Sequence, residues 1–110
     1  MTKAQWADKV ALISARLEER KALGNEILKN PEGVSYSLEL IKQQDSLLAT
    51  NAAYGLDIAL RKRIELLQPD LKLFLEVLEL NKIETVSRIL AKICELLTAA
   101  SIKKKTIVLN

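Results

Sequence analysis

The stretch SYSLELIKQQDSLLATNAAYGLDIALRKRIELL, residues 35–67, decides the fold class. Its apolar side chains recur every three to four positions, which is the period of an amphipathic α-helix. They are Leu40, Ile41, Leu47, Leu48, Ala52, Ile58 and Ala59. We predict one long helix over about residues 35–67. A break near Asn51 or Gly55 is the alternative, because a helix of this length is unusual in a globular protein.

Two polar amides, Gln44 and Asn51, fall on or near the apolar side of this helix. A buried amide needs hydrogen-bond partners. We therefore predict that Gln44 and Asn51 either form hydrogen bonds between helices or fix the register of a helix pair.

The helical period continues upstream, where we predict a first helix over about residues 2–29. Thr2 and Gln5 have the spacing of a capping box at its start. Pro31 disfavours helical backbone at the residue before it, so the helix ends there. The apolar stripe of this helix consists of Trp6, Val10, Ile13 and Leu17.

Downstream, we predict helices over about residues 69–80 and 82–100. Pro69 suits the first position of a helix, and Asn81 with Glu84 has the spacing of a second capping signal. Residues 71–78 also alternate in hydropathy, so a strand is the alternative there. The last residues, 101–110, end in β-branched side chains and are predicted to form a short extended tail.

These elements predict an all-α fold, a compact bundle of about four helices in a single domain over residues 1–110. The composition agrees with a helical globular fold. Of the residues, 49% are hydrophobic, and only three glycines and two prolines are present to interrupt helices. A chain of 110 residues can bury enough surface to fold without a disulfide or a metal ion.

The composition also excludes several kinds of chemistry. The chain has no histidine and one cysteine, Cys94, which excludes imidazole-based catalysis and Cys-rich metal sites within one chain. Its three glycines stand apart, so there is no phosphate-binding loop. We predict no enzymatic activity, no cofactor, no metal site and no small-molecule substrate, and we expect Cys94 to be a buried, inert thiol.

The start of the chain has no apolar run like that of a signal peptide, and no segment has the length of a membrane span. With the single cysteine, this predicts a cytoplasmic protein with no membrane partner.

The predicted helices differ in length, and a helix that outruns its neighbours leaves apolar surface for another chain. We therefore predict a non-enzymatic interaction protein that buries a helix face against a second copy, as a dimer, or against another protein. The candidate interface residues are Trp6, Val10, Ile13, Leu17, Gln44 and Asn51. The alternative is that these residues form the core of the chain itself.

Basic residues form three groups, although the net charge is only +3. The groups are Arg16 with Arg20 and Lys21, Arg61 to Arg63, and Lys103 to Lys105. Ion pairs within helices, such as Glu84 with Arg88, account for part of this charge.

Residues 84–90, Glu-Thr-Val-Ser-Arg-Ile-Leu, resemble the start of the recognition helix in helix-turn-helix regulators of the Crp/Fnr-like and LacI-like families. Residues 102–109 are similar to the basic, β-branched wing of Crp/Fnr-like proteins. The resemblance implies an alternative function, DNA binding through residues 71–110, with 71–78 as the supporting helix. The nucleic-acid contacts under this alternative are Thr85, Ser87, Arg88, Lys92, Lys103, Lys104 and Lys105.

Overall fold

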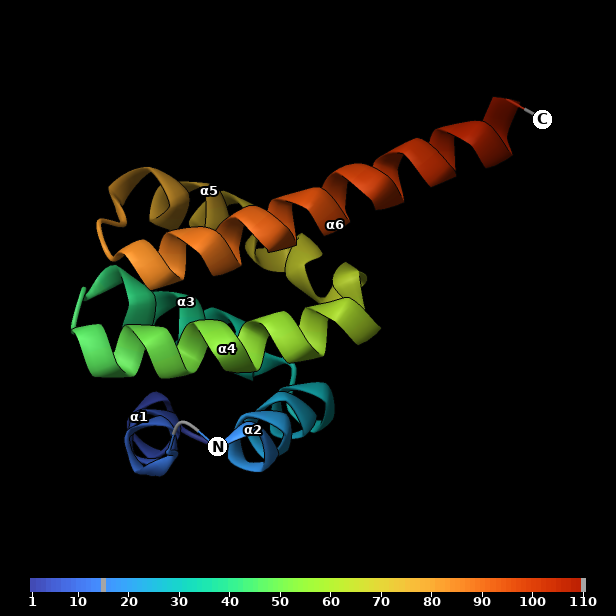
Figure 1. The fold of residues 1–110 in the computed structure, drawn as a ribbon. Helices are drawn as coiled ribbons and strands as arrows, with labels where there is room; N and C mark the ends of the chain where they lie inside the picture. Colours follow the sequence, from blue (N-terminus) through green and yellow to red (C-terminus); the bar gives the residue numbers. More distant parts are fainter. Residues whose placement is uncertain (15, 110) are drawn as a thin grey trace.

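The computed structural model describes the backbone of residues 1–14 and 16–109 and the side chains of residues 1–14 and 16–101. Within that part of the chain every regular element is a helix, which confirms the all-α prediction. The elements are α1 (Lys3–Leu12), α2 (Leu17–Lys29), α3 (Glu32–Lys42), α4 (Ser46–Lys62), the 3-10 helix η1 (Ile64–Asp70), α5 (Leu71–Leu80) and α6 (Glu84–Leu109). They stack in three layers, with α1 and α2 on one side, α3 and α4 in the middle, and α5 and α6 on the other side (Figure 1).

The number of helices differs from the prediction of about four, because both long predicted helices are broken. The first is divided into α1 and α2. Its break has no glycine or proline, and the backbone is extended at Ile13 and Arg16. Asn51 of α4 donates hydrogen bonds to the carbonyls of Val10 (3.1 Å) and Ile13 (3.4 Å) at the end of α1. A side chain far along the sequence therefore caps this helix.

The second long helix is divided before the predicted position. Its break follows α3, where Gln44 has a positive φ of 59°. Asp45 then caps α4, since its carboxylate accepts a hydrogen bond from the backbone N–H of Leu48 at 3.0 Å. Asn51 and Gly55, the predicted sites of a break, lie inside α4.

The predicted helices 35–67 and 69–80 also meet differently, because α4 ends at Lys62, the 3-10 helix η1 follows, and α5 begins at Leu71. Residues 71–80 form the helix α5, so the alternative of a strand there is wrong. The backbone of α6 is helical through Leu109, where the sequence predicted an extended tail from residue 101.

The central helix of the molecule is α4, which is buried around most of its circumference. Its buried residues are Ala49, Asn51, Ala52, Ala53, Gly55, Leu56, Asp57, Ala59 and Leu60. Most of these side chains are small, so neighbouring helices can approach closely. The helices α1, α2, α3 and α6 all pack against α4.

The closest approach is between α2 and α4, and it depends on glycine. A Cβ atom on Gly24 would lie 2.6 Å from Cγ2 of Ile58, and one on Gly55 would lie 2.7 Å from Cδ2 of Leu23. At the same crossing the guanidinium of Arg20 stacks on the ring of Tyr54, 3.6 Å from its centroid.

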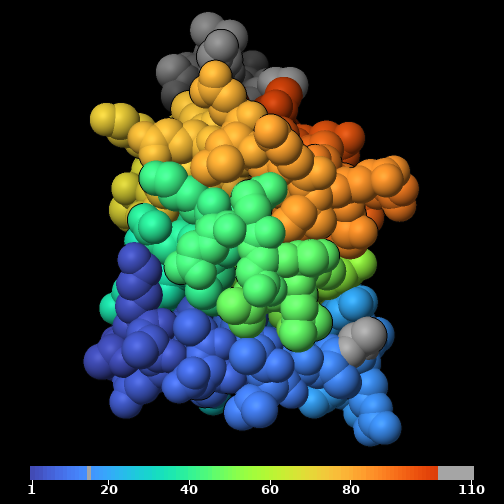
Figure 2. All heavy atoms as spheres, turned by 90° about the vertical axis from the view of Figure 1, so that its left-hand side faces the viewer, coloured from blue at the N-terminus to red at the C-terminus, as the bar shows by residue number. Residues whose placement is uncertain are grey.

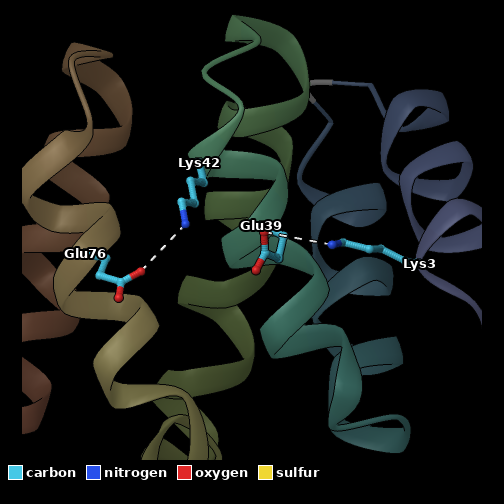
Figure 3. A network of polar contacts seen from close by, with 4 residues as sticks. All are labelled: Lys3, Glu39, Lys42 and Glu76. Carbon is cyan, nitrogen blue, oxygen red and sulfur yellow. Dashed lines mark ion pairs between the residues drawn. The ribbon is translucent and has the colours of Figure 1, made fainter.

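Exposed ion pairs link the three layers (Figure 3). Lys3 of α1 pairs with Glu39 of α3 at 3.8 Å, and Lys42 of α3 pairs with Glu76 of α5 at 3.6 Å. Such pairs contribute little to stability because water screens them. Among the described helices, none combines the length and the apolar character that crossing a membrane requires.

Candidate interaction surfaces

Two of the predicted interface residues, Trp6 and Val10, lie in the core of the chain rather than on its surface. Both are fully buried. The indole N–H of Trp6 donates a hydrogen bond of 2.9 Å to the hydroxyl of Ser37, which is also buried. This corrects the prediction for these two residues, because a side chain covered by its own chain presents no surface to a partner.

Gln44 and Asn51 form the hydrogen bonds between elements that the sequence predicted, and they form them within the chain. Asn51 is buried and joins α4 to the end of α1. The amide nitrogen of Gln44 donates to the side-chain oxygen of Asn81 at 3.0 Å. Its amide oxygen accepts from the backbone N–H of Lys82 at 2.8 Å. Figure 2 shows this side of the molecule, where the middle layer (green) meets the start of α6 (orange).

The other two predicted interface residues, Ile13 and Leu17, border the connection between α1 and α2. Ile13 is half-buried, whereas 61% of Leu17 is exposed. Leu12, which the sequence analysis missed, is 83% exposed and is the most exposed large apolar side chain among the described residues. The only signal for it in the sequence is that Leu12 lies off the stripe that contains Val10 and Ile13.

A groove of about 210 Å³ lies beside this connection, between α1 and α2. We call it the α1–α2 groove; it is lined by Lys9, Ile13, Glu19, Ala22, Leu23 and Glu26. Ile13, Ala22 and Leu23 provide apolar surface. The charged residues have both signs, and Lys9 pairs with Glu26 at 3.3 Å. The groove is therefore apolar with a rim of mixed charge.

The residues of the DNA-binding alternative are distributed along α6. Thr85 is half-buried, whereas Ser87, Arg88 and Lys92 are exposed. The hydroxyl of Ser87 accepts a hydrogen bond of 2.9 Å from the amide of Asn81. Arg88 pairs with Glu84 at 2.7 Å, as the sequence predicted. The side chains of Lys103, Lys104 and Lys105 lie outside the described residues.

The packing of α5 and α6 bears on the same alternative. In a helix-turn-helix the supporting helix packs against the recognition helix. Here α5 packs mainly against α3 and η1, whereas α6 packs mainly against α4. The resemblance to helix-turn-helix regulators remains a prediction.

A second concavity, of about 470 Å³, lies between the end of α4 and the middle of α6. We call it the α4–α6 concavity; its lining residues are Arg61, Lys92, Glu95, Leu96 and Ala99. Arg61 donates to the carboxylate of Asp57 at 3.1 Å. Arg61 of the second basic group and Lys92, which is far from it in sequence, line the same concavity.

Three of the described groups have altered pKa values, and none of them lines the α1–α2 groove or the α4–α6 concavity. Hydrogen bonds from its own backbone N–H and from Arg63 lower the pKa of Glu65. Burial raises the pKa of the Cys94 thiol, so the half-buried sulfur stays protonated at neutral pH. Burial also raises the pKa of Asp70, and the Ser35 hydroxyl opposes that rise. Among the described residues, no group of three or more acidic or cysteine side chains is arranged to hold a metal ion.

Comparisons with protein-family models, with curated proteins and with solved structures found no match to this chain.

Proposed function

We propose that this chain is a non-enzymatic interaction protein that forms a dimer through the α1–α2 groove and the two leucines beside it. The observations that support the proposal are the exposure of Leu12 (83%) at the end of α1 and Leu17 (61%) at the start of α2, and the apolar groove between these two helices. Transfer of apolar surface from water contributes roughly 25 cal/mol per Å², before the cost of association is subtracted.

The shape of this surface suits helix-on-helix burial. A groove between two helices accepts apolar side chains from a third element, as in other complexes in which a helix lies in a groove. The exposed side chains of Leu12 and Leu17, near the connection between α1 and α2, provide further apolar surface. This matters because a stable interface buries about 800 Å² on each partner, which is more than the groove alone provides.

The charges at the rim favour a second copy as the occupant. In a symmetric dimer the same patch faces itself, so a rim of one sign repels its copy. The rim of the α1–α2 groove has one lysine, Lys9, and two glutamates, Glu19 and Glu26. A two-fold axis can therefore place opposite charges across the interface.

The test is the mass of the protein in solution, measured by sedimentation equilibrium over a concentration series. We expect the mass to rise towards that of a dimer. The double variant Leu12→Glu with Leu17→Glu should weaken dimerisation by about 100-fold or more, because it places two carboxylates in an apolar interface.

Leu75→Glu is the matched control. Leu75 is also an exposed leucine (56%), but it lies on α5 in the layer opposite α1 and α2. Its variant should dimerise like the natural protein. A natural protein that stays monomeric at millimolar concentration, or a control that dissociates as much as the double variant, contradicts the proposal.

A further inference from the structure

We infer that the α4–α6 concavity binds an acidic amphipathic segment of a different protein. The surface lies away from the proposed dimer interface, because α6 and the α1–α2 pair occupy opposite layers (Figure 1). A dimer would therefore leave both copies of the concavity accessible.

The concavity exists because α6 is much longer than the helices around it. Its first half packs on α4 through Val86, Leu90 and Ile93, which are buried. Its second half continues beyond the body of the molecule (Figure 1). Lys92, Leu96 and Ala99 are spaced four and three residues apart, so they lie along one side of α6, facing Arg61 at the end of α4.

Two cations, Arg61 and Lys92, and one anion, Glu95, line this surface. Arg61 is partly neutralised by Asp57. Lys62 follows Arg61 in the last turn of α4, where both cations also offset the negative end of the helix. Lys92 forms no ion pair within the part of the chain that the structure describes, although Glu95 lies one turn away. Glu95 is the last acidic residue of the sequence, and three lysines follow it.

This charge distribution disfavours a second copy of the chain as the occupant. A symmetric contact would bring Arg61 and Lys92 close to the same residues of the partner, and like charges across an interface oppose binding. The α1–α2 groove has the opposite balance, because one cation and two anions line it, whereas two cations and one anion line the α4–α6 concavity.

The apolar part of the concavity favours a peptide over a nucleic acid. Leu96 and Ala99 offer no hydrogen-bond donors to phosphate, and no aromatic side chain lines the concavity on which a base could stack. An amphipathic segment satisfies both parts of the surface. Its carboxylates would face Arg61 and Lys92 while an apolar side chain covers Leu96 and Ala99.

The test is a fluorescence-anisotropy titration of the full chain with three labelled probes. The first is a synthetic amphipathic helix with a leucine stripe flanked by glutamates. The second has the same leucines flanked by lysines, and the third is a random duplex DNA. We expect the acidic peptide to bind and the lysine peptide to bind at least about tenfold more weakly.

Charge reversal provides the specific control. Arg61→Glu with Lys92→Glu should weaken binding of the acidic peptide by about tenfold or more and strengthen binding of the lysine peptide. Lys29→Glu, an exposed change on α2 in the opposite layer, should leave both affinities unchanged. The dimer-disrupting double variant Leu12→Glu with Leu17→Glu should still bind the acidic peptide, so the two proposals can fail separately.

Two outcomes overturn the inference. One is the absence of acidic-peptide binding at low salt. The other is binding of duplex DNA with a steep inverse salt dependence that Arg88→Ala or Lys92→Glu weakens, while the acidic peptide does not bind. That result would instead support the DNA-binding function implied by residues 84–90.

Discussion

Gly24 is the residue on which the packing of α2 against α4 depends. The atoms nearest to a Cβ at this position include the Cβ of Ile58 at 2.9 Å and the backbone nitrogen of Ala59 at 3.4 Å. These atoms belong to or adjoin the backbone of α4, so they cannot move away independently. At Gly55 the two nearest atoms are Cδ2 (2.7 Å) and Cγ (2.9 Å) of the Leu23 side chain, which lie farther from a helix backbone and can shift by rotation.

We therefore predict that Gly24→Ala destabilises the protein and that Gly55→Ala does so less. Alanine improves helix propensity by about 1 kcal/mol, whereas overpacking costs about 1–3 kcal/mol. The net loss at Gly24 should be up to about 2 kcal/mol in the free energy of unfolding. Urea denaturation followed by the fluorescence of Trp6, the only tryptophan, measures it.

Asn25→Ala is the matched control for these variants, because Asn25 is exposed in the same helix. The free energy of unfolding of the Asn25→Ala protein should not fall below that of the natural protein. A Gly24→Ala protein as stable as the natural one, or less affected than Gly55→Ala, would show that α2 and α4 are not as close as described.

Trp6 illustrates the limit of prediction for a single residue. Its position at the head of an apolar stripe is typical of both an interface and a core. The hydrogen bond from its indole to Ser37, 31 positions away, decides in favour of the core. Nothing in the spacing of apolar residues distinguishes the two, because spacing defines a helix face without defining what covers it.

At the scale of the element, two of the helix boundaries involve the two amides that the sequence predicted to form hydrogen bonds between helices. Asn51 donates hydrogen bonds to two carbonyl groups at the end of α1, those of Val10 and Ile13. Gln44 adopts a positive φ between α3 and α4, and its side chain bonds to the link between α5 and α6. Both amides could be identified from the sequence, whereas their partners could not.

Two variants of Gln44 can distinguish what its side-chain hydrogen bonds contribute to stability from what its backbone conformation contributes. We predict that Gln44→Ala lowers the free energy of unfolding by about 1–3 kcal/mol, since it removes the hydrogen bonds to Asn81 and Lys82. Gln44→Gly removes the same bonds but tolerates the positive φ, so its loss should be smaller by about 1 kcal/mol. Thermal and urea denaturation measure both.

The neighbouring Gln43 is the control, because it is exposed and has an ordinary helical backbone. Gln43→Ala should change stability by less than about 0.5 kcal/mol. If the alanine and glycine variants of Gln44 lose the same free energy of unfolding, the positive φ at this position has no effect on stability.

At the scale of the whole molecule, α4 links helices that barely touch one another. The layer of α1 and α2 and the layer of α6 both pack against it from opposite sides. Removing any of them exposes buried surface of α4. This arrangement favours unfolding as a single cooperative unit.

We predict that Trp6 fluorescence and far-ultraviolet circular dichroism report the same urea midpoint. The fluorescence follows α1, in which Trp6 is fully buried, and the dichroism follows all the helices. A fluorescence transition that precedes the loss of helix would contradict the prediction and would show that α1 detaches from a folded remainder.

By itself, the sequence determined that this chain is helical, that Thr2 caps the first helix together with Gln5, and that Gln44 and Asn51 need polar partners. These properties depend on residues close together along the chain, and such spacing can be read directly. Only the tertiary structure decided where the long apolar runs break, that Trp6 and Val10 are covered while Leu12 and Leu17 are exposed, and that Arg61 and Lys92 line one concavity. These properties depend on which distant surfaces meet, because burial and helix capping here involve partners tens of residues away.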